Sequence, residues 1–155
     1  MNERKERLSW DAMYMEIAKT VAKRSSDPHT QVGCVIVSPT KQILGIGYNG
    51  APRKFEGDFN WLTESKYDYV IHAEMNAIAN ACAIGANLVG AELYLTMSPC
   101  HDCMKLIVQH QISKVTFLNE YKDFELSLRI ARACGTKMSE MKMEDKKVKS
   151  ITQWN

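Results

Sequence analysis

The sequence predicts an α/β fold in three layers (α/β/α), in which a mixed five-stranded sheet with an opening hairpin is covered by helices. Two short apolar runs, 32–37 and 43–48, predict the hairpin. From residue 72 onward, helical and strand-like segments alternate, which is typical of strands connected by crossover helices. The 155 residues, 45% of them hydrophobic, are expected to form a single domain, 1–155, with its core at about 8–142.

The first predicted element is a helix that begins after Ser9 and ends near Ser25. The Ser9 hydroxyl can accept a hydrogen bond from the backbone as an N-cap, and Asp11 is favourable in the first turn. Asp27-Pro28 then ends the helical pattern. The apolar residues of this segment recur at helical spacing: Trp10, Met13, Ile17 and Val21.

The strands at 32–37 and 43–48 are joined by a turn around residues 38–41, and a long loop follows them. The stretch 49–69 is polar and aromatic, has no regular period, and contains Gly50, Pro52 and Gly57. Loops of this length inside a compact domain are often functional. We therefore interpret this segment as a long loop that lies over one face of the domain.

The second half of the chain predicts three helices and three strands in alternation. The helices are 72–83, 100–110 and 123–134, and the strands are 91–97, 114–119 and 136–142. Gly135 stops the last helix. Beyond it, Lys146, Lys147 and Lys149 predict a solvated basic tail over 143–155.

Composition excludes several classes of protein. The charged N-terminus lacks the apolar core of a signal peptide, and no run approaches membrane-spanning length, so no membrane partner is expected. Five cysteines without an export signal indicate reduced thiols and a cytoplasmic location. The net charge of +2 is too small to predict a nucleic-acid partner, but it is compatible with a small phosphorylated substrate.

Two short motifs carry the chemistry: His72-Ala73-Glu74 and, later, Pro99-Cys-His-Asp-Cys103. Imidazole and thiolate are the ligands that Zn²⁺ prefers in proteins. Two cysteines three residues apart reach one metal from the first turn of a helix, where the helix dipole favours both thiolates. We therefore expect His72, Cys100 and Cys103 to bind one zinc ion.

The ligand count and Glu74 together indicate a catalytic zinc site. Structural zinc sites normally have four protein ligands, whereas catalytic sites have three and bind water at the fourth position. A zinc ion lowers the pKa of bound water towards neutrality, and Glu74 is placed to act as the proton carrier. The alternatives are a buried histidine with two core cysteines, and a carboxylate that only stabilises a helix start.

The remaining candidates for metal ligands are weaker. His101 lies between the two cysteines and is expected to point away from a metal that they share. Cys34, Cys82 and Cys134 are interpreted as small core residues rather than ligands.

The two motifs match the His-x-Glu and Pro-Cys-x-x-Cys signature of zinc-dependent nucleobase deaminases. From about residue 8 to residue 134, the chain resembles the deoxycytidylate (dCMP) deaminases of the cytidine deaminase superfamily. The segments that carry the resemblance are Ser26-Asp-Pro-His-Thr-Gln-Val-Gly33, Gly45-Ile-Gly-Tyr-Asn-Gly50, His72-Ala-Glu-Met-Asn-Ala-Ile78 and Pro99-Cys-His-Asp-Cys-Met-Lys-Leu-Ile107.

The resemblance implies a cytidine-deaminase-like fold and the hydrolytic deamination of dCMP to dUMP and ammonia, which supplies dUMP for thymidylate synthesis. The catalytic residue is then Glu74. Some members of this family bind a second, structural zinc in the loop before the catalytic histidine, but residues 51–71 contain no Cys or His here, so we expect one catalytic zinc per chain. It also implies that the carbonyl of Ser98 accepts from the 4-amino group and that the N–H of Ala73 meets O2 of the ring. Asn49 is expected at the sugar, and Tyr121 near the substrate.

The resemblance further implies regulation by nucleotides and a homo-hexameric assembly. In this family dCTP activates and dTTP inhibits at a separate site, with Mg²⁺ on the triphosphate. The candidate residues for that site in this chain are Arg24, Ser25, Gly47, Tyr48, Asn49 and Gly50. Charge and position add Arg53 and Lys54 to Arg24 and Ser25 as candidate phosphate contacts. Gly47 and Gly50 would supply backbone freedom for a switch.

Two other functions remain open from the sequence. Another zinc deaminase, acting on free cytidine or cytosine or on tRNA adenosine, would use the same metal motif. A zinc-stabilised nucleotide-sensing module without catalysis would use the fold alone, although Glu74 and the missing fourth ligand argue against it.

Overall fold

The structure is a computed structural model that describes residues 7–55, 57, 59–143 and 147–150. Its sheet has the strand order β2-β1-β3-β4-β5-β6. The strands are β1 (Gly33–Val37), β2 (Ile43–Tyr48), β3 (Glu92–Met97), β4 (Lys114–Asn119), β5 (Lys137–Lys142) and β6 (Lys147–Ser150). β1 pairs antiparallel with β2 and β3, whereas β3, β4 and β5 are parallel. All five predicted strands are present, and the mixed sheet is confirmed.

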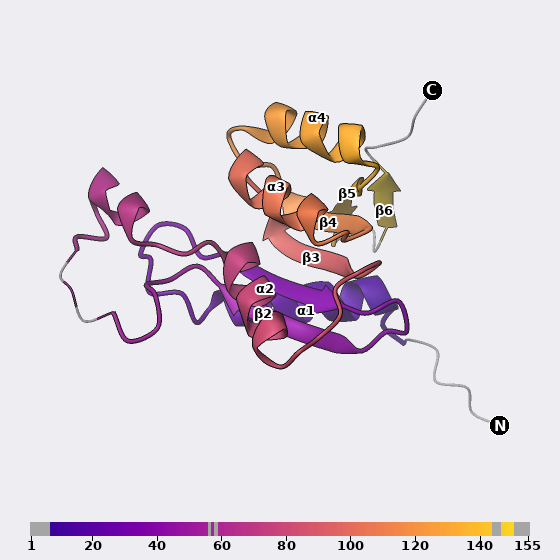
Figure 1. The fold of residues 1–155 in the computed structure, drawn as a ribbon, viewed down its shortest axis with the longest axis horizontal. Coiled ribbons are helices and arrows are strands. Elements are labelled where there is room, and N and C mark those ends of the chain that lie inside the picture. Colours follow the sequence, from indigo (N-terminus) through magenta and orange to yellow (C-terminus); the bar gives the residue numbers. More distant parts are fainter. Residues whose placement is uncertain (1–6, 56, 58, 144–146, 151–155) are drawn as a thin grey trace.

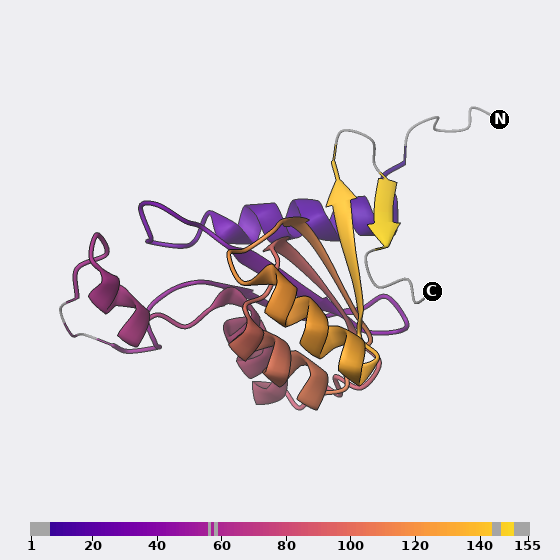
Figure 2. The same ribbon diagram turned by 90° about the horizontal axis from the view of Figure 1, so that it is seen from above.

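Helices cover both faces of the sheet, which gives the predicted three layers (Figures 1 and 2). α1 (Trp10–Ala22) packs on one face, and α2 (Ala73–Ala83), α3 (His101–Gln109) and α4 (Phe124–Cys134) pack on the other. Each face has its own cluster of buried apolar side chains. The larger cluster includes Leu93, Leu95 and Phe117 under the three helices, and the smaller includes Val35 and Tyr94 under α1.

The helix α1 begins at the predicted cap, and of its predicted apolar residues Val21 is buried, Met13 and Ile17 are partly buried, and Trp10 is exposed. The Ser9 hydroxyl accepts the Ala12 N–H at 3.1 Å. Trp10 is 54% exposed, whereas Ala18 is fully buried. A Cβ placed at Gly33 would lie 1.9 Å from the Ala18 carbonyl oxygen, so small residues allow this helix to pack directly on the backbone of β1.

The helix α2 packs equally closely on the opening hairpin. A Cβ at Gly47 would lie 2.3 Å from the Ala77 nitrogen and 2.4 Å from the Ala73 carbonyl oxygen. Gly47 is therefore required for this close approach, and its backbone is not in the left-handed region. This corrects the expectation that Gly47 serves as a flexible joint: it fixes the first turn of α2 against the sheet.

Two segments differ from the expectation. The predicted solvated tail contains strand β6, which pairs antiparallel with β5, while Lys146 lies outside the described residues. The long loop contains a short 3₁₀ helix, η1 (Glu64–Asp68). Among the described residues, no helix has the length and apolar character needed to cross a membrane.

The ends of the elements place the site. Cys100 is the N-cap of α3, and His72 is the N-cap of α2. Both helices lie on the same face of the sheet (Figure 2). The connections 23–32 and 49–71 project from this same end of the sheet (Figures 1 and 2). Open α/β sheets bind ligands where helix starts and connecting loops meet in this way.

Candidate active site

His72 is held at the start of α2 by the backbone that precedes it. Ile71 and Gly50 form an isolated antiparallel bridge, in which the Ile71 N–H donates to the Gly50 carbonyl at 2.8 Å and the Gly50 N–H donates to the Ile71 carbonyl at 3.1 Å. His72 itself has an extended conformation (φ −69°, ψ 156°) as the N-cap. The imidazole is therefore aimed by rigid backbone on both sides.

Cys100 and Cys103 occupy the first turn of α3, as predicted. Cys100 is the N-cap, and its sulfur accepts the Cys103 N–H at 3.5 Å. The strand that leads into this turn is fixed by the Ser98 N–H, which donates to the Asn119 carbonyl at 2.7 Å. The two sulfurs thus lie on one side of the helix start.

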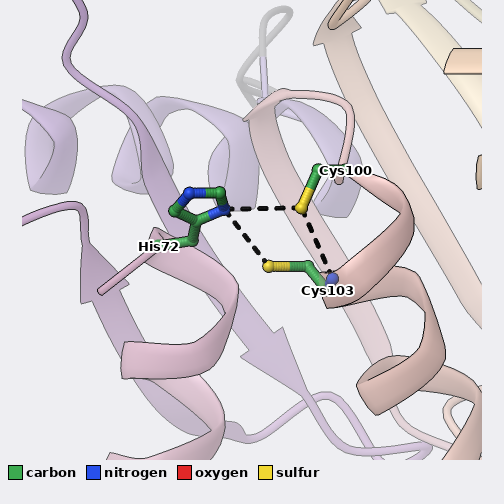
Figure 3. Close-up of side chains that lie close together, drawn as sticks. All are labelled: His72, Cys100 and Cys103. Atoms are coloured by element: carbon green, nitrogen blue, oxygen red, sulfur yellow. Dashed lines mark hydrogen bonds between the residues drawn. The ribbon is translucent and has the colours of Figure 1, made fainter. Parts of the chain in front are cut away.

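The three predicted metal ligands meet in the structure (Figure 3). His72 Nδ1 lies 3.5 Å from Cys100 Sγ and 3.4 Å from Cys103 Sγ, and all three ligand atoms are within 4.8 Å of one another. Zinc bound tetrahedrally by one nitrogen and two sulfurs separates each nitrogen–sulfur pair by about 3.6 Å. The side chains therefore fit a zinc ion with little movement.

The three side chains of the cluster shift one another's pKa values. The pKa of Cys100 is lowered to about 4, first by the hydrogen bond from the Cys103 thiol and then by His72. The same hydrogen bond, together with burial, raises the pKa of Cys103. The hydrogen bond to Cys100 also raises the pKa of His72. One thiolate is thus present before metal binds, and a zinc ion supplies the charge that removes the second thiol proton.

Glu74 lies in the first turn of α2 and is 4% exposed. Burial raises its carboxyl pKa to about 7, against the opposing effect of the nearby His72. A carboxyl group that changes protonation near neutral pH can both accept and return a proton. A zinc ion on His72 would add positive charge and favour the ionised form.

The remaining histidine and cysteines near these motifs do not join the cluster. His101 Nδ1 lies 2.5 Å from Asp123 Oδ2, which also accepts the His101 backbone N–H at 3.1 Å, so His101 points away as predicted. Cys34 is buried, whereas Cys82 and Cys134 are exposed. The interpretation of the last two as core residues was wrong, because both lie on the solvent side of their helices.

A cavity opens beside His72 and Cys100 and is lined by five other predicted residues. The space inside it, including the open solvent at its mouth, is about 620 Å³. Ala73, Ser98 and Tyr121 line it together with Glu74. The Ser98 hydroxyl accepts the Tyr121 N–H at 2.8 Å, which ties the two residues together.

Asn49 also lines the cavity, and its amide group is anchored on both sides. Its Oδ1 accepts the Val32 N–H at 2.8 Å, and its Nδ2 donates to the Thr30 carbonyl at 2.8 Å. The side chain is 7% exposed. It therefore joins β2 to the 23–32 connection and presents a fixed polar group to the cavity.

Apart from Asn49, the residues proposed for regulation are not among the described residues that line the cavity. The Ser25 hydroxyl donates to the Asn49 carbonyl at 2.8 Å, and the Arg24 guanidinium lies 5.9 Å from the centre of the Tyr48 ring. Gly50 is bridged to Ile71. The hydrogen bond from Ser25 thus connects this group of residues to Asn49, which lines the cavity.

The sequence did not predict that a lysine, Lys66, lines the cavity. Lys66 of η1 lines the cavity, and its Nζ lies 2.8 Å from Asp27 Oδ2. Nothing in the sequence connects these residues, which are 39 positions apart. The predicted phosphate contacts Arg24, Ser25, Arg53 and Lys54 are not among the described residues that line the cavity.

The sequence matches a known family over most of its length. The family described as the cytidine and deoxycytidylate deaminase zinc-binding region matches residues 8–119. A probable deoxycytidylate deaminase of Drosophila melanogaster is 43% identical over 150 residues, which cover 86% of this chain and 73% of that protein. The deoxycytidylate deaminase of Mus musculus is 40% identical over 131 residues, covering 79% of this chain and 72% of that protein.

The fold is also similar to a solved structure of a related enzyme. The dCMP deaminase of cyanophage S-TIM5, in complex with dCMP and dUMP, aligns with a TM-score of 0.75 and 30% identity. The alignment covers 83% of this chain and 94% of the phage protein. The similarity therefore extends over nearly the whole of a known nucleotide deaminase.

Proposed function

Because the chain belongs to the cytidine and deoxycytidylate deaminase family, we propose that it hydrolyses dCMP to dUMP and ammonia, supplying dUMP for thymidylate synthesis. One observation carries this proposal. His72, Cys100 and Cys103 could together hold a zinc ion, no fourth ligand joins them among the described residues, and the buried Glu74 lines the cavity beside them. A closed structural zinc site would have a fourth protein ligand.

In this proposal the protein supplies the proton transfers through Glu74. When bound, the zinc ion supplies Lewis acidity that makes a water molecule a better nucleophile. The Glu74 carboxylate accepts a proton from the water that attacks C4 and delivers it to N3 of the cytosine ring. It then takes the remaining proton of the hydroxyl now on C4 and passes it to the amino nitrogen, so that the C4–N bond breaks, ammonia leaves and C4 becomes the carbonyl of dUMP. Burial raises the pKa of this carboxyl group, so it holds a proton between the two transfers more readily than an exposed carboxylate would.

The remaining cavity residues orient the ring and the sugar. The carbonyl of Ser98 is proposed to accept from the 4-amino group, and the N–H of Ala73 to donate to O2. Both groups belong to backbone at a helix start, so they are rigid donors and acceptors. Asn49 is proposed to contact the sugar, and Tyr121 to pack beside the substrate.

Ammonia release with a panel of substrates tests the proposed reaction. We expect turnover with dCMP to exceed turnover with deoxycytidine, CMP, guanine and a tRNA hairpin. Preference for a substrate without a 5′-phosphate would indicate a free cytidine or cytosine deaminase, and preference for the hairpin a tRNA deaminase. Zinc binding without turnover of any of them would indicate a nucleotide-sensing module.

We further propose that dCTP activates and dTTP inhibits the enzyme, with Mg²⁺ on the triphosphate, in a cytoplasmic homo-hexamer. The hydrogen bond from Ser25 to the Asn49 carbonyl supports a link between the two sites, since Asn49 lines the cavity. Arg24, which lies over the ring of Tyr48, offers the charge for a triphosphate in this region.

The regulation is tested by turnover against dCMP concentration, with Mg²⁺ and with or without each triphosphate. We expect dCTP to lower the dCMP concentration at half-maximal rate and dTTP to raise it, each by about 5- to 150-fold at saturation. Light scattering of the same samples reports the subunit count. Curves that neither nucleotide moves would remove the regulatory proposal and leave the reaction untouched.

A further inference from the structure

Lys66 is the one lysine or arginine among the described residues that line the cavity, and it is buried. It comes from η1 in the long loop, and its side chain is 10% exposed. A lysine so far removed from water is rare unless its charge is paired. The ion pair of Lys66 with Asp27, and the N–H donors of Lys66 that this pair does not use, indicate the role of this residue.

Asp27 fixes the position of the Lys66 ammonium. Its Oδ2 lies 2.8 Å from Nζ, while its Oδ1 accepts the backbone N–H groups of His29 at 2.9 Å and Thr30 at 3.2 Å. The carboxylate is 4% exposed, so this pair is shielded from water and screened little by salt. The long loop is thereby joined to the connection that follows α1.

The ammonium group retains hydrogen-bonding capacity. A lysine has three N–H donors, and Asp27 takes one of them. The ring centre of Tyr67 lies 5.2 Å from Nζ and offers a cation–π contact, and no other hydrogen-bond partner of Nζ occurs among the described residues. Two donors are therefore available to a ligand in the cavity.

A second lysine, Lys122, lies near the rings of Tyr67 and Tyr121. The Lys122 ammonium is 5.7 Å from the ring centre of Tyr67 and 5.6 Å from that of Tyr121, and both rings line the cavity. Because Asp27 also receives two backbone N–H groups, the pair with Lys66 does not leave this region negative. The part of the cavity bounded by Tyr67 and Tyr121 therefore favours an anion.

We propose that Lys66, held by Asp27, binds the 5′-phosphate of the nucleotide substrate, with Lys122 as a second and more exposed cation. This inference rests on the proposed function, in which the cavity takes a cytosine nucleotide. A phosphate monoester carries close to two negative charges at neutral pH and accepts several hydrogen bonds, which matches the two free donors. A nucleoside without phosphate leaves these donors unpaired in a buried site, and the enzyme discriminates against it for that reason.

Equilibrium binding of dUMP and deoxyuridine to the zinc-loaded protein tests the assignment. The variant is Lys66→Met, and the control is Lys137→Met, which removes an exposed lysine of β5 that is not among the described residues lining the cavity. We expect Lys66→Met to lose about 10- to 100-fold in affinity for dUMP and about 2-fold or less for deoxyuridine, since a hydrogen bond to a charged group contributes about 1.5–3 kcal/mol. Lys137→Met should match the wild type, and Lys66→Arg should keep most of the preference for dUMP.

The double variant Asp27→Asn/Lys66→Met removes both charges of the pair and must show the same selective loss. Retention of the wild-type ratio of the two affinities in either variant would overturn the assignment. So would an equal loss for both ligands, because it would mean that Lys66 only holds the loop. Turnover of dCMP by the wild type tests the reaction separately, so a protein that binds dUMP through Lys66 but releases no ammonia would refute the reaction and support this site.

Discussion

Glu74→Gln is expected to reduce turnover of dCMP by about 10³- to 10⁴-fold while the protein keeps its zinc and its fold. The amide is similar in size to the carboxyl group, so the packing at the start of α2 is preserved. It cannot accept a proton at neutral pH, and one carboxylate serves both proton transfers, so the loss lies at the upper end of the range for general acid–base catalysis. Ammonia release, zinc content and thermal melting of the same preparation measure the three properties.

Glu125→Gln is the matched control, because Glu125 also lies in the first turn of a helix, α4, but is exposed. Its turnover should equal that of the wild type, which separates the loss of a proton carrier from a general effect on helix dipoles. Turnover within 10-fold of the wild type in Glu74→Gln would refute the role assigned to this carboxyl group.

Cys100→Ser and Cys103→Ser are each expected to lose stoichiometric zinc and to melt at a lower temperature. The ion would join the starts of α2 and α3, so its binding free energy contributes to the stability of the folded domain. Binding at 1,000 times the dissociation constant contributes about 4 kcal/mol, which corresponds to a shift on the order of 10 °C for a domain of this size. Elemental analysis and thermal melting measure the two effects.

A chelator provides the internal test of this explanation. It should lower the melting temperature of the wild type towards that of the variants, and it should leave the variants unchanged. Cys82→Ser and Cys134→Ser, which alter exposed cysteines, should keep both zinc and the response to the chelator. Stoichiometric zinc in both Cys100→Ser and Cys103→Ser would contradict the ligand set.

The parts of the molecule that are encoded locally were predictable. The helix α1 begins at Ser9 because a hydroxyl satisfies its first N–H groups, and Cys100 and Cys103 share one side of α3 because of their spacing. Each of these features is determined within about one turn of the chain. The meeting of His72 with the two cysteines was inferred from the chemistry of zinc rather than from periodicity.

The parts that depend on distant contacts were not predictable. Lys66 pairs with Asp27 across 39 residues, and the long loop that carries it has no regular period. The close packing of α1 on β1 was also not predictable, because the contact of Ala18 with Gly33 depends on how closely two backbones approach. Hydrophobic periodicity reports which residues are apolar, but it does not report which neighbour allows the closest packing.

The cavity of this protein is assembled from two kinds of structure, and this division has an evolutionary consequence. The groups that would perform the bond-breaking step belong to helix starts set on the sheet, whereas Asp27 and Lys66 belong to connections that leave it. Connections tolerate insertion and replacement far better than packed elements do. Descendants of one ancestral gene could therefore acquire new substrates by exchanging these connections while inheriting an unaltered reaction centre.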